Sequence, residues 1–301
     1  MKLKTKQDFR LFLYVLPLII FIIIFKYLPL WGWTYAFVRY IPGRSLSKCQ
    51  FVGLQNFRDL FANPVMMRNI LRVLRNTFGI NLVALLFTPL PMFFAVFLSE
   101  IKSKKFQKIV QTATTLPNFI SWVIIFSLAI SMLGTTGMIN NLLKGLGIST
   151  RINVLTSNKH VWLTQVLLQQ WKMLGWNAIV YFAAIAGLDQ GIYEAAMVDG
   201  ASKMQRIWHI TIPQLIPTYF VLLIINIGNF LNTGVDQYLA FGNALNNDFI
   251  EVLDLYVYKL GIGNGQISYG VVVGSLKSLV ALIMFWGANA ASKKIRGTSV
   301  F

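Results

Sequence analysis

Four side chains with hydrogen-bonding, charged or aromatic groups recur on one face of an apolar stretch in the middle of the chain. Gln165, Gln169, Lys172 and Trp176 follow one another at helical spacing, so a helix places them in one row. Amides both donate and accept hydrogen bonds, which suits sugar hydroxyls, and an ammonium group attracts anions. The stretch is therefore a candidate lining for the path of a polar solute.

Lys172 has two interpretations, and the sequence leaves both open. A charged side chain within an apolar segment normally faces a cavity or a partner. No acidic residue lies at the centre of any apolar stretch of the chain. The lysine therefore contacts an anionic ligand on the solute path, or it has a structural role against a backbone carbonyl or a partner subunit.

Further polar and aromatic residues belong to the same hypothesis. Asn226, Asn229, Thr233 and Asp236 fall on one helical face, and tryptophan and tyrosine rings offer apolar surfaces for stacking. Interhelical hydrogen bonds and ordinary packing explain such residues without any ligand. Stacking surfaces are expected from Trp122, Trp171, Trp176 and Tyr181. The candidate path residues are Lys172, Gln169, Trp176, Asn177, Asn118, Trp122, Asn226, Asn229 and Asp236.

The segment 189–213 is a second candidate site, because helix-forming residues flank a turn signal. Alanine, methionine, glutamine and arginine favour helix, Asp199-Gly200 is typical of a turn, and Pro213 is typical of a helix start. These signals predict two short helices at an angle. A stiff hairpin of this kind transmits the movement of a bound partner to the attached helices.

The chain carries no recognisable catalytic or metal-binding pattern. It contains no GxxxxGK[ST] phosphate loop, and the glycine run 261–265 follows no predicted strand and is predicted to form a turn. Cys49, His160 and His209 make no metal-ligand cluster. We therefore expect a non-enzymatic chain that binds no cofactor.

Six apolar stretches are long enough to position these residues across a membrane. Of 301 residues, 56% are apolar and only 12% are charged, whereas soluble proteins carry about 25% charged residues. A membrane-crossing helix needs roughly 20 apolar residues. The fold is expected to be an all-α polytopic membrane protein, with residues 1–301 as a single transmembrane domain. The predicted spans are about 11–33, 78–98, 109–133, 161–188, 214–235 and 267–290.

Prolines are expected to kink several of these spans, because each removes a backbone donor. They are Pro89 and Pro91 in the second, Pro117 in the third and Pro217 in the fifth.

Basic residues in short segments predict the orientation. Clusters at 2–10, 102–108 and 293–296 favour a cytoplasmic location for both termini. The net charge of +17 is distributed among these segments rather than over one soluble basic face, which argues against nucleic-acid binding.

The segment between the first two spans is expected to lie outside the membrane and is strongly basic. Asp59 is its only acid. From Asn56 to Arg75, apolar and basic residues alternate at near-helical spacing, which predicts an amphipathic helix at the interface. This helix contacts lipid phosphates and a partner subunit, or its charge attracts an anionic solute. The basic residues are Arg39, Arg44, Lys48, Arg58, Arg68, Arg72 and Arg75.

The hairpin segment resembles the EAA loop of ABC importer permeases. The string EAAMVDGASKMQRIWHITIP, which begins at Glu194, is similar to the carbohydrate-uptake form of this motif. It departs at Ile212, before Pro213, where many members have leucine, and this exchange of one apolar residue for another leaves the resemblance intact. FVGLQNF at 51–57 resembles the segment after span one in sugar permeases. LPNFISW at 116–122 and WKMLGW at 171–176 resemble the branch of oligosaccharide and polysaccharide-fragment permeases.

The resemblance implies a type I importer permease of six spans in a bacterial cytoplasmic membrane. The implied partners are a second, homologous permease, a homodimeric cytoplasmic ATPase that binds ATP and Mg, and an extracytoplasmic solute-binding protein. The implied ATPase-coupling residues are Glu194, Ala195, Ala196, Asp199, Gly200, Ala201, Ile210 and Pro213.

The expected function is oligosaccharide import, and Lys172 with the basic outer segment adds the hypothesis that the sugar is acidic, for instance uronate-containing. Three alternatives stay open: a secondary transporter, an ABC permease for another solute such as amino acids or phosphate, and a non-transport scaffold or sensor. A secondary transporter would favour intramembrane acids and an inverted repeat, and neither is visible in the sequence.

Overall fold

Helices make up most of the chain in this computed structural model, which describes residues 6–148, 153–155 and 157–296. They belong to two units. The first unit contains the described residues up to 67 together with 257–276, and the second contains 68–256 together with the described residues from 277. Within the described residues, the strands β1 (Val38–Arg39) and β2 (Gln50–Phe51) form one antiparallel ribbon.

The first unit is built around an apolar helix and a hydrogen-bonded loop. Helix α1 (Lys6–Ile22) continues through a π turn, Ile23–Tyr27, into the 3-10 segment Leu28–Phe37. The side chain of Asn56 on α2 (Gln55–Ala62) donates to the carbonyls of Ala36 and Val38 at 2.8 and 2.9 Å. The ribbon is therefore joined to α2 by an amide that is 3% exposed.

The amphipathic helix predicted from Asn56 to Arg75 is wrong as a single element. Asn63 is extended, and its side chain accepts from the backbone N–H of Val65 and Met66 at 3.0 and 3.2 Å. Proline disfavours the helical conformation in the residue before it, and proline itself is favoured in the first turn of a helix. A new helix, α3 (Pro64–Leu86), therefore begins here and places the basic residues Arg68, Arg72 and Arg75 at the start of the second long helical segment.

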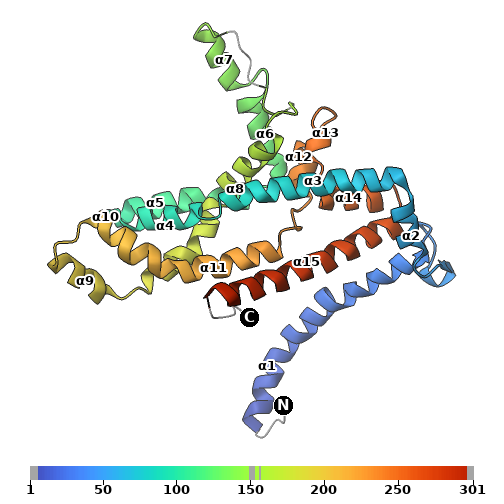
Figure 1. The fold of residues 1–301 in the computed structure, drawn as a ribbon, viewed down its shortest axis with the longest axis horizontal. Coiled ribbons are helices and arrows are strands. Elements are labelled where there is room, and N and C mark those ends of the chain that lie inside the picture. The colour runs from blue at the N-terminus through green and yellow to red at the C-terminus, as the bar shows by residue number, and fades with distance from the viewer. Residues whose placement is uncertain (1–5, 149–152, 156, 297–301) are drawn as a thin grey trace. The chain divides into compact units, whose positions relative to one another are not determined.

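The second unit packs its helices around α8 (Val161–Ala186). Helix α8 contacts α4 (Leu90–Ser99), α5 (Lys104–Thr115) and α11 (Ile212–Gly228) (Figure 1). One core contains Met92, Ala95, Val96, Ala178, Tyr181, Ile207, Ile212 and Leu215. A second core joins α6 (Trp122–Leu133) to α12 (Asp236–Phe241) and α13 (Asn247–Ile250). The remaining helices are α7 (Met138–Gly145), α9 (Gln190–Val198), α10 (Lys203–Arg206), α14 (Leu253–Tyr258) and α15 (Ile267–Arg296).

Five helical segments in the described part of the chain are long and apolar enough to cross a membrane. The fourth of the six predicted spans is α8, which has 26 residues and is long enough to cross. Its glutamines, Lys172 and Asn177 make it more polar than the others, so a sixth span stays a prediction. The five segments are Arg10–Phe37, Pro64–Ser99, Trp122–Gly145, Lys203–Gly228 and Ile267–Ala290.

Several predicted boundaries are wrong where a helix breaks. The predicted span 109–133 is interrupted by the 3-10 turn Leu116–Phe119 and by extended Ile120. The predicted span 214–235 ends at Gly228. Of the glycine run 261–265 expected to form a turn, the first three residues instead continue α14 as the π-helix Lys259–Gly263, and the bend is confined to 264–265, where Gly265 has a φ of 68°. Prolines explain the break at Leu116–Phe119, since Pro117 lies within it.

Candidate solute path and coupling hairpin

A cavity of about 330 Å³ lies among α3, α4, α8 and α11 in the second unit. Five of the predicted path residues line it: Gln169, Trp176, Asn177, Asn226 and Asn229. All the residues recorded along this cavity are uncharged. Its hydrogen-bonding capacity therefore comes from amides and hydroxyls, which accept and donate to sugar hydroxyls alike.

Four polar residues of this cavity were not among the predicted path residues: Asn81, Thr88, Gln170 and Asn232. Asn81 and Thr88 are seven residues apart, which in a helix places them on one face of the predicted second span. This spacing is the sequence signal by which they could have been included among the path residues. Thr88 is also hydrogen-bonded to Tyr219, with 3.1 Å between the oxygens.

Lys172 does not line this cavity, because its ammonium group reaches the break between α5 and α6. The Nζ atom donates to the carbonyls of Pro117, Asn118 and Ile120 at 3.0, 2.8 and 2.5 Å. It also lies 5.5 Å from the centre of the Trp122 ring. The sequence left three partners open for Lys172: an anionic ligand, a backbone carbonyl or a partner subunit. In the structure the lysine contacts backbone carbonyls. The Pro117 carbonyl also accepts from the Ile120 N–H at 3.2 Å, and lipid would not satisfy a carbonyl left without a partner at the break.

Three other predicted path residues lie away from the amide-lined cavity. Trp122 and Asp236, together with Lys172, line a separate cavity of about 440 Å³ beside α6 and α12. Asn118 lines neither cavity and contributes its carbonyl to Lys172. The predicted path residues therefore divide between a cavity beside α8 and α11 and the helix break.

Helix α8 crosses α5 at very close range beside this break. A Cβ atom added to Gly175 would lie 2.4 Å from the carbonyl carbon of Thr114. Such a distance requires a residue without a side chain. Gly175 and Lys172 are three residues apart on α8, so backbone contact and hydrogen bonding secure the same crossing.

Two of the basic residues between the first and second predicted spans contact the α13 region, one through ion pairs and the other through a backbone carbonyl and a ring. Arg72 forms an ion pair with Asp248, at 2.7 Å, and another with Glu251. Arg75 donates to the Asp248 carbonyl at 2.8 Å and lies over the Phe249 ring. These two arginines therefore hold α3 to the α13 region, and the attraction of an anionic solute is left to the other basic residues.

The segment 189–213 contains a helix on each side of the Asp199-Gly200 turn. Asp189 caps α9 by accepting from the Gly191 N–H at 2.8 Å. Gly200 has a φ of 78°, a conformation that glycine adopts without strain. Ser202 and Gln205 form a capping box at the start of α10. The second helix is longer than predicted, because it continues without interruption into α11.

Helix α9 presents both its acidic and its apolar residues to solvent. Glu194 is exposed, and Val198 and Met197 at its end are 87% and 52% exposed. Of the other predicted coupling residues, Ala195, Asp199, Gly200 and Pro213 are exposed, and Ala196, Ala201 and Ile210 are half-buried.

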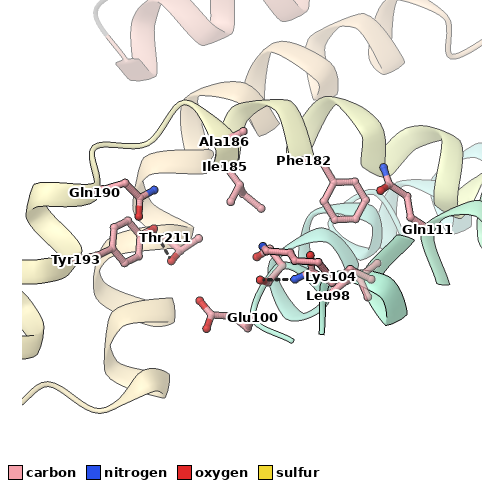
Figure 2. Close-up of a pocket in the computed structure, with 12 residues that line it drawn as sticks. Leu98, Glu100, Lys104, Gln111, Phe182, Ile185, Ala186, Gln190, Tyr193 and Thr211 are labelled. Atoms are coloured by element: carbon pink, nitrogen blue, oxygen red, sulfur yellow. Dashed lines mark hydrogen bonds between the residues drawn. The ribbon is translucent and has the colours of Figure 1, made fainter. Parts of the chain in front are cut away.

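Two polar contacts hold this hairpin, one within it and one to Glu100, the residue that follows α4. The hydroxyls of Tyr193 and Thr211 are 2.9 Å apart (Figure 2). Lys203 forms an ion pair with Glu100 at 3.3 Å and donates to its carbonyl at 2.5 Å. A cavity of about 450 Å³ lies beside the first contact, and its polar lining includes Gln107, Gln111 and Gln190.

Comparisons with known proteins identify relatives over nearly the whole chain. Residues 87–297 match the family described as "Binding-protein-dependent transport system inner membrane component". Protein LplB of Bacillus subtilis is 38% identical over 98% of this chain and 92% of its own length. The polygalacturonan/rhamnogalacturonan transport system permease protein YteP of the same organism is 37% identical over 99% of this chain and 92% of its own length.

Solved structures give the same result. A chain of a bacterial ABC transporter involved in the import of the acidic polysaccharide alginate is 33% identical, with a TM-score of 0.83 and 97% of each chain covered. A chain from the alginate transporter in complex with an alginate pentasaccharide-bound periplasmic protein is 33% identical, with a TM-score of 0.84 and 98% of each chain covered.

Proposed function

The chain belongs to the family of binding-protein-dependent transport system inner membrane components, and from that premise we propose that it carries acidic oligosaccharides into the cytoplasm. Members of this family are the non-catalytic permease subunits of ABC importers, and the ATPase is a separate subunit. The proposal concerns the solute, its direction and the residues of this chain that line its path.

The observation that carries the proposal is the cavity lined by amides on α3, α8 and α11. Asn81, Asn177 and Asn226 reach it from three different helices, so hydrogen-bonding groups surround a solute on several sides. Trp176 adds an aromatic face that is 44% exposed, a surface on which a sugar ring stacks. An uncharged lining binds a sugar through hydrogen bonds. It does not hold a charged sugar so strongly that the release of the sugar becomes slow.

The acidic character of the sugar is supported by the relatives and not by Lys172. The structural neighbour imports alginate, an acidic polysaccharide, and YteP belongs to a polygalacturonan/rhamnogalacturonan system. Lys172 is engaged by three carbonyls, and Arg72 and Arg75 are engaged near α13. The carboxylates of a uronate are instead received by side-chain N–H groups of the amides, which donate to anions as well as to hydroxyls.

We assign the docking of the ATPase to the hairpin. Exposed Met197 and Val198 beside Glu194 suit a helix that inserts into a groove of a partner. The other proposed partners are a second homologous permease and an extracytoplasmic binding protein, and ATP and Mg bind to the ATPase. In this arrangement both termini face the cytoplasm, although Lys2 and Lys4, on which the orientation partly depends, lie outside the described residues.

Reconstitution tests the proposal directly. The chain is purified with its partner permease, ATPase and binding protein, and ATP-dependent uptake into proteoliposomes is measured for galacturonate, mannuronate and guluronate trisaccharides. We expect vanadate-sensitive uptake of a uronate trisaccharide in preference to neutral maltotriose. Preference for maltotriose refutes the acidic class. Uptake driven by an ion gradient without the ATPase supports the secondary-transporter alternative instead.

A further inference from the structure

An ion pair joins the last long helix to the start of α14. Lys277 on α15 and Asp254 on α14 form a salt bridge, and their side chains are only 13% and 16% exposed. Lys277 falls within the apolar segment Ile267–Ala290. A charge at such a position is costly unless it is paired, so this pair requires an explanation.

The other carboxylate oxygen of Asp254 holds the loop that follows α11. It accepts from the backbone N–H of Thr233 and of Gly234, both at 2.9 Å. Two converging N–H groups form a site for a carboxylate, and Gly234, with a φ of 78°, provides the turn that aims the second. Burial and then the negative charge of Asp254 raise the pKa of the Tyr238 phenol.

The same loop carries two amides of the cavity. Asn229 and Asn232 both line it, and the Asn232 side chain donates to that of Asn229 at 3.2 Å. The Asn232 N–H also donates to the Asn229 carbonyl at 2.8 Å. Because Asn232 directly precedes Thr233, the hydrogen bonds of Asp254 fix the backbone next to one of the lining amides.

We infer that Lys277 and Asp254 are positioning residues, which hold Asn229 and Asn232 in the orientation that the solute meets. Lys277 neutralises Asp254, Asp254 binds the N–H groups of Thr233 and Gly234, and the fixed loop presents the two amides. The loop geometry follows from the ion pair and the hydrogen bonds of Asp254 alone, and the consequence for the solute rests on the proposed function. Neither Lys277 nor Asp254 lines the cavity, so the pair acts through the loop.

The loop geometry is tested by hydrogen exchange on the complete transporter, without any sugar. We expect the amides of Thr233 and Gly234 to exchange about tenfold or more faster in Lys277→Met, because an unpaired buried carboxylate takes up a proton or turns toward water and then accepts less well from the two N–H groups. Lys277→Arg and the neutral pair Lys277→Met/Asp254→Asn should stay close to wild type. Lys293→Met, an exposed lysine on the same helix, is the matched control. Unchanged exchange in Lys277→Met overturns the inference.

The consequence for the solute is tested by a double-mutant cycle on uptake of the uronate trisaccharide. Asn232→Ala and Lys277→Met should each raise the apparent KM, and the double variant should be no worse than the worse single one. If the rise in apparent KM of the double variant equals the product of the two single rises, Lys277 does not act through the loop and the inference is overturned. If exchange follows the prediction but wild type imports no oligosaccharide, the positioning role stands and the proposed function fails.

Discussion

The ammonium group of Lys172 lies 3.0 Å from the carbonyl oxygen of Pro117, on the turn where α5 gives way to α6. The lysine is 7% exposed and bonds two further carbonyls of the same turn. A charge buried in the span predicted at 161–188 thus compensates for the N–H groups that a broken helix lacks. We therefore expect Lys172 to contribute to the stability of the fold, and other residues to determine which solute is bound.

Replacing Lys172 by glutamine should therefore lower stability without changing solute preference. Loss of charged hydrogen bonds to buried carbonyls costs about 1.5–3 kcal/mol each, so we expect a lower unfolding temperature and less assembled transporter. The measurements are thermal unfolding in detergent and the ratio of uronate to maltotriose uptake per assembled complex. A stable variant that loses only uronate uptake would instead place Lys172 on the solute path.

Gly175→Ala should weaken the crossing of α8 and α5. The added methyl group would lie 2.4 Å from the carbonyl carbon of Thr114, and relieving such a contact costs about 1–3 kcal/mol. Gly187→Ala at the end of the same helix is the control, because its methyl group meets nothing closer than 3.6 Å. Thermal unfolding of the two variants in detergent checks this, and equal stability would contradict the close crossing.

Asn226→Ala should reduce uptake at low sugar concentration. It removes one amide of the cavity, and an unmade hydrogen bond to a solute costs about 0.5–1.5 kcal/mol. We expect a several-fold rise in apparent KM with little change in the amount of protein in the membrane. Asn141→Ala on α7, an exposed residue outside that cavity, should leave uptake unchanged. Equal effects of the two variants would remove the cavity from the solute path.

Gly200→Pro and Glu194→Lys should leave the permease in the membrane and uncouple it from the ATPase. Proline cannot adopt the φ of 78° at Gly200, and the lysine reverses a charge on the exposed face of α9. Gly200→Asn is the milder control, because asparagine tolerates this conformation. Co-purification of the ATPase with each variant is the measurement. Normal co-purification with both damaging variants argues against docking by the hairpin.

The Asp199-Gly200 turn and five residues that line the cavity could be predicted because their signals are local. Gly200 lies at a turn dipeptide, and Gln169, Asn177, Asn226 and Asn229 are amides in apolar segments. The partner of Lys172 could not be predicted, since it depends on where a neighbouring helix unwinds. Asp254 was missed because it lies outside the predicted spans, and nothing in the sequence connects it to Lys277.

The hairpin is held by two contacts of different chemistry, one inside it between the hydroxyls of Tyr193 and Thr211 and one that ties Lys203 to Glu100 at the end of α4. The first joins the two sides of the hairpin to each other, and the second joins the hairpin to the rest of the unit. The Lys203 side chain is 52% exposed, so salt screens the ionic contact and leaves the hydroxyl contact intact. High ionic strength should therefore loosen the hairpin from α4 while its own two sides stay together.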